Sequence, residues 1–195
     1  MTSVPGRASV FLASLMLVLF SGCGGSSGST DPRVLKLLNE GVGAMGIFDF
    51  SRAEQLFQEA VQLAPKNHYA RLDLGISILN QSEPDSQERA LKIFKAALAD
   101  RARFPEARYC AGLADLYMGR PARAAKRFEA VTQTNPEDAH AWFYLGQCQE
   151  LDSDLEDSLA SYMRSIELDP MLRSPLLGAQ RVLQRLSREQ EAAEY

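Results

Sequence analysis

The stretch that decides the fold is residues 139–170, which read AHAWFYLGQCQELDSDLEDSLASYMRSIELDP. Gly146 lies in its first half, in a run without proline. In the second half, small and large residues follow one another at intervals of four, three and five: Ser158, Tyr162, Ser165 and Pro170. The apolar residues between them recur with helical spacing, and the proline ends that run. The stretch therefore predicts two helices whose small residues let the backbones approach.

The same pattern occurs three more times along the chain. Two other series keep all three intervals: Ala53, Phe57, Ala60 and Pro65, and Ala124, Phe128, Val131 and Pro136. A third series keeps the first two intervals: Ala90, Phe94 and Ala97. A glycine lies in the helical segment before each series: Gly41, Gly75, Gly112 and Gly146. The chain is thus built from copies of one helix-turn-helix unit, which buries its apolar face only when its neighbours stack on it.

This pattern resembles the tetratricopeptide repeat, a helix-turn-helix unit of about 34 residues. The resemblance implies an all-α solenoid of about four repeats over residues 32–172, with units at 34–67, 68–104, 105–138 and 139–172. The second unit is longer than the others, and its extra residues are expected in a loop within 80–87. Residues 173–195 carry one apolar stripe and one polar face, which is typical of a terminal capping helix or of the first helix of a truncated fifth repeat.

Three positions depart from the repeat pattern. Phe48 and Ser153 stand where the turn of the unit usually has glycine. Asp115 falls at a place that is usually apolar, and a shift of the third repeat by two residues would bring Leu113 or Tyr117 there instead. We keep the unshifted register, because it preserves the glycines and the full repeat length.

The N-terminus ends a short apolar run with Leu19-Phe20-Ser21-Gly22-Cys23. This resembles the lipobox of bacterial lipoproteins, which implies cleavage of residues 1–22 and acyl chains, including palmitate, on Cys23. The apolar run from Val10 rises roughly 16 Å as a helix, too little to span a bilayer core of about 30 Å. An ordinary secretory signal and an uncleaved N-terminal anchor are the alternatives.

Residues 23–31 follow as a Gly- and Ser-rich tether without an apolar side chain after the cysteine. Gly24, rather than Asp, resembles lipoproteins sent to the outer membrane of enteric-type bacteria. The expected location is therefore the bacterial outer membrane, on its periplasmic side.

Composition narrows the class of partner. The chain has a net charge of −4, so nothing suggests nucleic acid, which needs a basic face. Beyond Cys23 there are two further cysteines, Cys110 and Cys148, both within predicted helices. In an oxidising compartment they either pair or act as two small buried apolar residues.

No arrangement of residues predicts an enzyme, a cofactor or a metal centre. Residues 41–46 spell G-x-G-x-x-G, but a helical segment precedes them where a dinucleotide site needs a strand. The two histidines, His68 and His140, lack ligand spacing for zinc, and the acidic turn at 152–157 lacks the spacing of a calcium loop. No motif orders a nucleophile with a base, and we expect no small-molecule substrate.

The resemblance also implies a binding surface, because the first helix of each repeat lines the concave face in this family. The positions that carry over are Tyr69, Leu72, Ile76, Tyr109, Leu113, Tyr117, His140, Phe143 and Gln147. This face is largely apolar and aromatic, and it lacks the Lys, Asn and Arg residues with which chaperone-tail binders of the family clamp a carboxylate. A peptide or helix of a protein partner is the expected ligand. Alternatively the face is core, is filled by the terminal helix or a second copy, or leaves binding to the convex face.

The predicted function is a lipid-anchored interaction scaffold or assembly factor of the bacterial cell envelope. Two alternatives remain: a soluble secreted scaffold, and a non-catalytic binding subunit of an envelope enzyme complex. The partner itself is not named by the sequence.

Overall fold

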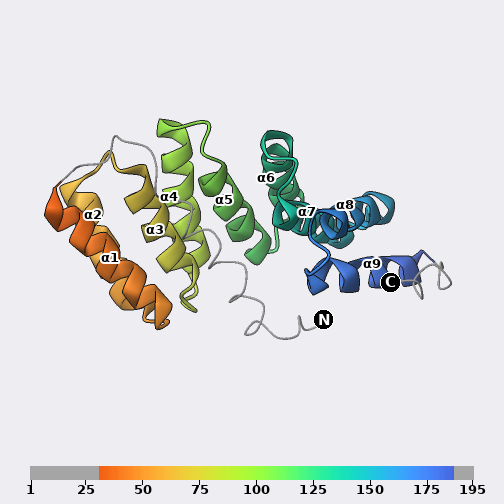
Figure 1. Cartoon of the computed structure of the whole chain (residues 1–195), viewed down its shortest axis with the longest axis horizontal. Coiled ribbons are helices and arrows are strands. Elements are labelled where there is room, and N and C mark those ends of the chain that lie inside the picture. Colours follow the sequence, from red (N-terminus) through yellow and green to blue (C-terminus); the bar gives the residue numbers. More distant parts are fainter. Residues whose placement is uncertain (1–30, 187–195) are drawn as a thin grey trace. The chain divides into compact units, whose positions relative to one another are not determined.

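The computed structural model describes residues 31–186, and within them it has nine helices and no strand (Figure 1). The all-α fold class is confirmed. The described residues fall into two compact units that divide between Ile93 and Phe94, inside one helix, α4 (Ser86–Asp100). Cys23, with the predicted signal peptide and most of the tether, lies outside the described residues, as do residues 187–195.

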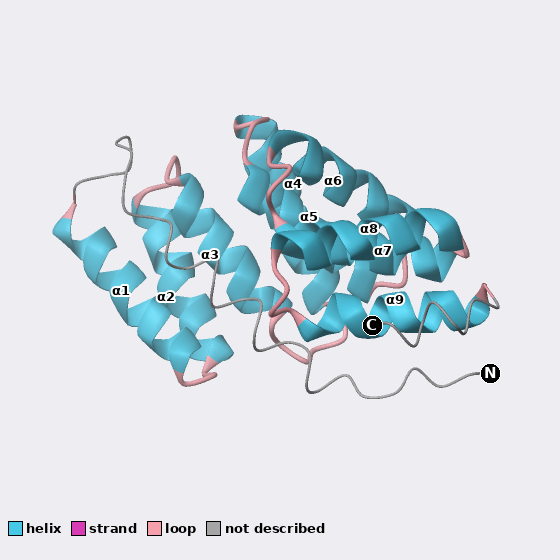
Figure 2. Cartoon of the chain, turned by 45° about the vertical axis from the view of Figure 1, so that its right-hand side comes forward, coloured by secondary structure: helices cyan, strands magenta, loops and turns pink. Residues whose placement is uncertain are grey.

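The described part of the first unit begins with the pair α1 (Pro32–Gly46) and α2 (Phe50–Leu63), followed by α3 (His68–Leu79). Packing joins α1 to α2 and α2 to α3, and the pair of α1 and α2 lies side by side in Figure 1 and in the turned view of Figure 2. The core of the first unit includes Val34 of α1, Ala60 of α2 and Ala70 of α3, with Ala64 directly after α2. Small residues at these contacts let the helices lie close together.

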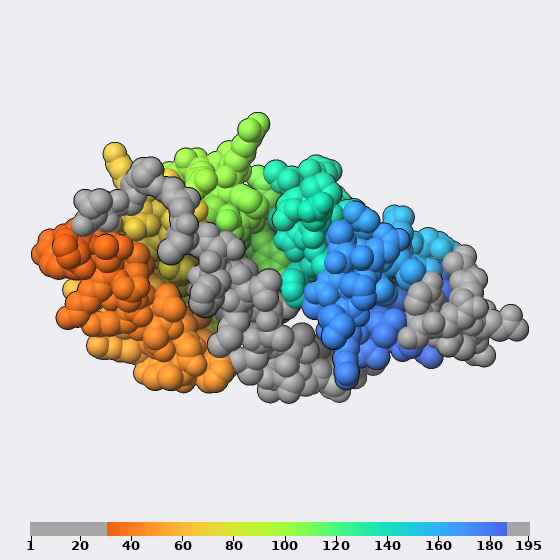
Figure 3. Space-filling model, viewed as in Figure 1, coloured from red at the N-terminus to blue at the C-terminus, as the bar shows by residue number. Residues whose placement is uncertain are grey.

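The second unit contains α5 (Pro105–Tyr117), α6 (Pro121–Thr134), α7 (Ala139–Asp152), α8 (Leu155–Leu168) and α9 (Arg173–Arg185). Each of these helices packs against the next, and α9 also contacts α7. Figure 3 shows this unit in space-filling form, coloured from green to blue along the sequence. The most deeply buried side chains include Phe128 and Tyr162, the large members of the repeated series.

Side-chain caps explain where several helices begin. Asp49 accepts a hydrogen bond from the backbone N–H of Arg52 at 3.0 Å, and Asp138 accepts one from Ala141 at 2.9 Å. Asn67 accepts from both Tyr69 and Ala70 at the start of α3. These bonds satisfy N–H groups that have no partner within the helix.

One turn geometry joins the two helices in three of the repeats. Phe48, Gly119 and Ser153 all have φ between 61° and 69°, the left-handed region. In each case the next residue donates its N–H to a carbonyl five residues back: Asp49 to Ala44, Arg120 to Asp115, and Asp154 to Gln149. This is the Schellman arrangement, which normally takes glycine because a side chain is strained there. The sequence placed Phe48 and Ser153 at the glycine position of the turn, and that placement is confirmed.

The second repeat has a longer connection instead. Residues 80–85 join α3 to α4, and Gln81 in this loop donates to the Glu54 carboxylate of α2 at 2.6 Å. Arg89 also contacts Glu54. The extra residues therefore lie in the loop expected from the sequence, where the side chain of Gln81 ties them to the neighbouring helix.

Candidate functional site

The residues of the first unit that are predicted to line the concave face differ in accessibility. Tyr69, near the start of α3, keeps 40% of its surface, whereas Leu72 and Ile76 on the same helix are buried. Of these three residues, Tyr69 is the one that presents a large side chain to a ligand.

The second unit shows the same division. Tyr109, Leu113 and Phe143 are buried, and Tyr117, His140 and Gln147 are half-buried. The residues come from α5 and α7. The accessible part of the predicted groove is therefore more polar here than the full set of positions suggests.

An aromatic cluster joins these two first helices. Tyr109 on α5 meets Tyr144 on α7 edge to face, with ring centroids 5.7 Å apart, and Phe128 of α6 stacks on Tyr144 at 5.4 Å. Phe143 adjoins Tyr144 at 4.9 Å and Tyr162 at 6.0 Å. Burial is the main cause that raises the pKa of the Tyr109 phenol, with smaller contributions from neighbouring groups such as Tyr144. Tyr109 and Phe143 thus contribute to the packing of the second unit.

Helix α9 lies against the C-terminal end of α7. The Glu150 carboxylate accepts hydrogen bonds from Arg181 of α9, at 3.1 and 2.8 Å, and from the Tyr162 hydroxyl at 2.8 Å. Arg185 donates to the Glu150 carbonyl oxygen at 3.2 Å. These contacts hold α9 against the fourth repeat, as a capping helix or the first helix of a truncated fifth repeat would be held.

Neither of the two helical cysteines, Cys110 and Cys148, is in a disulfide, and both are buried. Burial, with a smaller contribution from the Asp152 charge, raises the pKa of the Cys148 thiol to about 12. A thiol with so high a pKa stays protonated at neutral pH and is a poor nucleophile. Both residues act here as small apolar side chains.

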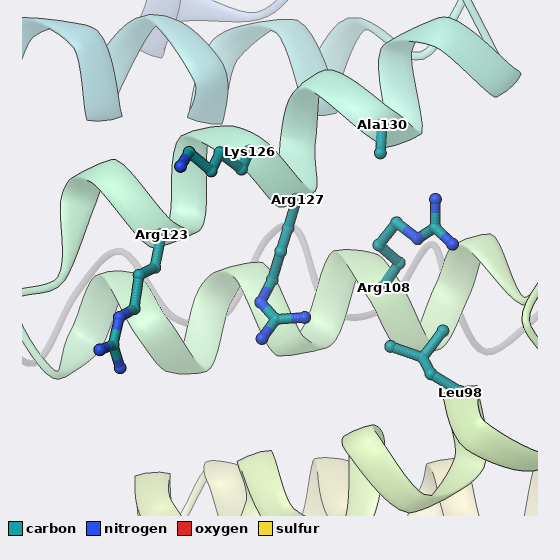
Figure 4. Close-up of a pocket in the computed structure, with 6 residues that line it drawn as sticks. All are labelled: Leu98, Arg108, Arg123, Lys126, Arg127 and Ala130. Atoms are coloured by element: carbon teal, nitrogen blue, oxygen red, sulfur yellow. The ribbon is translucent and has the colours of Figure 1, made fainter.

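A second surface of the second unit was not predicted. A pocket of about 440 Å³ is lined by four basic side chains, with two apolar residues beside them: Arg108, Arg123, Lys126, Arg127, Leu98 and Ala130. Figure 4 shows the basic side chains of α6 and α5 around this space. Residues 101–127 carry seven of the 21 basic residues and two acidic ones. This local excess of positive charge is a sequence signal for the basic surface, whereas the intervals of the repeat do not indicate it.

Asp115 is the acidic residue associated with this pocket. It is 1% exposed, and its Oδ2 accepts a hydrogen bond of 2.7 Å from Nε of Arg127. A nitrogen of Arg120 lies 4.0 Å from Oδ1, which accepts no hydrogen bond within the described residues. The carboxylate at a usually apolar position is therefore a buried anchor for an arginine of the next helix, and the unshifted register of the third repeat stands.

Other kinds of site find no support in residues 31–186. No group of three or more His, Cys, Asp or Glu side chains there has the arrangement of a metal site. Over the same residues, no helix has both the length and the apolar character that a membrane span requires.

The comparisons with known proteins agree with this geometry. Residues 109–170 match the family model described as tetratricopeptide repeat. No curated protein matches the chain.

Among solved structures, MamA 41-end from Desulfovibrio magneticus RS-1 is 22% identical, with a TM-score of 0.75 over 85% of this chain and 92% of that one. A structure titled "Crystal structure of MamA" is 18% identical, with a TM-score of 0.71 over 80% and 89%. At these identities the likeness concerns the fold. With the repeated glycine–aromatic contacts and the left-handed turns, it shows that the chain has the fold of a tetratricopeptide-repeat solenoid, and residues 109–170 match that family.

Proposed function

We propose that this protein is an interaction scaffold, held at the bacterial envelope by acyl chains on Cys23, and that a peptide or helix of a protein partner binds the first-helix face. The main support for the proposal is the repeat fold itself. In this fold the side chains of the predicted face come from the first helix of each repeat. Tyr117, His140 and Gln147 keep part of their surface in the second unit, beside a rigid aromatic cluster. A rigid base with accessible polar side chains lowers the entropy lost when a partner binds.

Photo-crosslinking in cells tests the binding face. A photoreactive amino acid at residue 140 or 147 is expected to form a covalent adduct of defined mass with a partner. The matched control is residue 164 on α8, where the Arg164 side chain keeps 43% of its surface but does not belong to the predicted face. Adducts at residue 164 with none at 140 or 147 would move the partner site to the second helices.

Intact-mass measurement of the protein extracted from membranes tests the anchor. We expect a chain that begins at Cys23 and carries the added mass of acyl groups, and Cys23→Ser is expected to lack both changes. A wild-type mass without lipid would remove the proposed anchor and favour a soluble scaffold.

A further inference from the structure

We propose that the basic pocket of the second unit binds an acidic segment of a protein partner, with Arg127 as its central contact. This surface consists of residues from α4, α5 and α6 and shares none of them with the predicted first-helix face. Its occupation is therefore independent of the function proposed above.

The charges around the pocket are not balanced from within the described part of the chain. The side chains of Arg123 and Lys126 are exposed, and neither side chain forms an ion pair or hydrogen bond with a described residue. Arg108 donates to a neutral acceptor, the carbonyl oxygen of Ala102, at 2.8 Å. Asp115 is engaged with Arg127 and lies buried beneath it. Several positive charges thus face the pocket in a chain whose net charge is −4, and a ligand with carboxylates complements them.

Asp115 holds Arg127 in a defined position. The hydrogen bond uses Nε of the guanidinium, so the N–H groups of its two terminal nitrogens are left for a ligand. In Figure 4 the Arg127 side chain extends from α6 between those of Arg123 and Arg108. An arginine that is already oriented loses less side-chain entropy when it binds a carboxylate in a bidentate manner.

The spacing of the cations favours a peptide over a single small anion. Arg123 and Arg127 are four residues apart on α6, a rise of about 6 Å. Carboxylates on alternate residues of an extended chain are about 6–7 Å apart. A lone phosphate would instead need the cations to converge on one point. Leu98 and Ala130 add an apolar wall for the side chains between the carboxylates.

A labelled nine-residue peptide of alternating Glu and Ala tests the proposal, with a Gln-for-Glu peptide as control. Fluorescence anisotropy with the full chain is expected to show binding of the acidic peptide that weakens as salt is added. Arg127→Gln and Arg123→Gln should each weaken it about tenfold, the loss of one charge-assisted hydrogen bond. Arg173→Gln makes the same change of charge on α9, outside the pocket, and should leave binding within about twofold of wild type.

Asp115→Asn separates positioning from simple attraction. The substitution makes the pocket more positive, so unspecific attraction alone would tighten binding, whereas loss of the anchor for Arg127 should weaken it. A melting curve shows whether Asp115→Asn is folded. If it is not, Arg123→Gln, at an exposed position, still tests whether the peptide binds in the pocket.

Three results would overturn the proposal. They are equal binding of the Gln peptide, unchanged binding by Arg127→Gln, and displacement of the peptide by inorganic phosphate at the same concentration. The last result would assign the pocket to a phosphate group instead.

Discussion

The Tyr162 ring lies so close to Gly146 that a Cβ at residue 146 would stand 2.8 Å from Tyr162 Cδ1. The same relationship, at the same separation of 16 residues, joins Gly41 to Phe57 and Gly112 to Phe128. Tyr162 also lies against Gly178 of α9, where a Cβ would collide with the ring as well. In these three repeats the aromatic residue of the second helix thus occupies the space that a glycine of the first helix leaves open.

Gly146→Ala is therefore expected to destabilise the second unit, because the new methyl group overlaps the Tyr162 ring. Overpacking of this kind costs about 1–3 kcal/mol in the free energy of unfolding. The matched control is Gly43→Ala in α1, where a Cβ meets nothing within 4 Å. There the alanine should raise helix stability by up to about 1 kcal/mol. Urea unfolding followed by circular dichroism measures both, and equal effects of the two substitutions would contradict the packing described.

The left-handed turns make a second prediction. Phe48→Gly is expected to stabilise the first unit by about 1 kcal/mol, because it relieves the strain of a side chain at φ 61°. Phe48 is 54% exposed, and its contact with Phe50, at a centroid distance of 6.2 Å, is the interaction lost. Gly119→Ala makes the reverse change in the third repeat and should lower stability by about 1–3 kcal/mol. Thermal unfolding of both variants decides the matter, and a lower Tm for Phe48→Gly would show that the ring contact outweighs the strain.

The aromatic cluster makes a third prediction. Tyr109→Ala or Phe143→Ala should each lower the free energy of unfolding by about 3–5 kcal/mol, because both rings are buried against Tyr144. His140→Ala, on the same helix as Phe143 but half-buried, should cost less than about 1 kcal/mol. Circular dichroism melting compares the three variants. A Tyr109→Ala protein as stable as wild type would show that this ring is available to a partner without a structural role.

Asp73 on α3 makes a prediction about pH. It is half-buried, and desolvation raises the pKa of its carboxyl from 3.8 to about 7. The folded state therefore holds this proton more tightly than the unfolded chain does. Stability associated with Asp73 should be greatest below about pH 4 and should fall as the pH rises toward 7. Asp73→Asn should remove this part of the decline, as measured by urea unfolding at pH 4.5 and 7.5, and an unchanged pH dependence would show that the carboxyl is well solvated.

The sequence alone determined the helical repeats, since each depends on residues close together in the chain. The intervals of small and large residues, the helix-breaking prolines and the unusual turn residues Phe48 and Ser153 all identify local structure. Even the pairing of Gly146 with Tyr162 follows from the repeat length, because two helices joined by a short turn must meet at a constant separation.

The tertiary structure decided which side chains remain accessible and which charges meet. Tyr69 and Ile76 occupy equivalent kinds of position in the repeat pattern, yet one is exposed and the other buried, because burial depends on everything packed around a residue. Asp115 departs from the apolar pattern of the repeat, and only the structure shows that it accepts a hydrogen bond from Arg127 on the next helix. The basic pocket arises in the same way, since Leu98, Arg108 and Arg123 come from three helices that only folding brings together. Local spacing determines a helix, whereas a site depends on the contacts between helices.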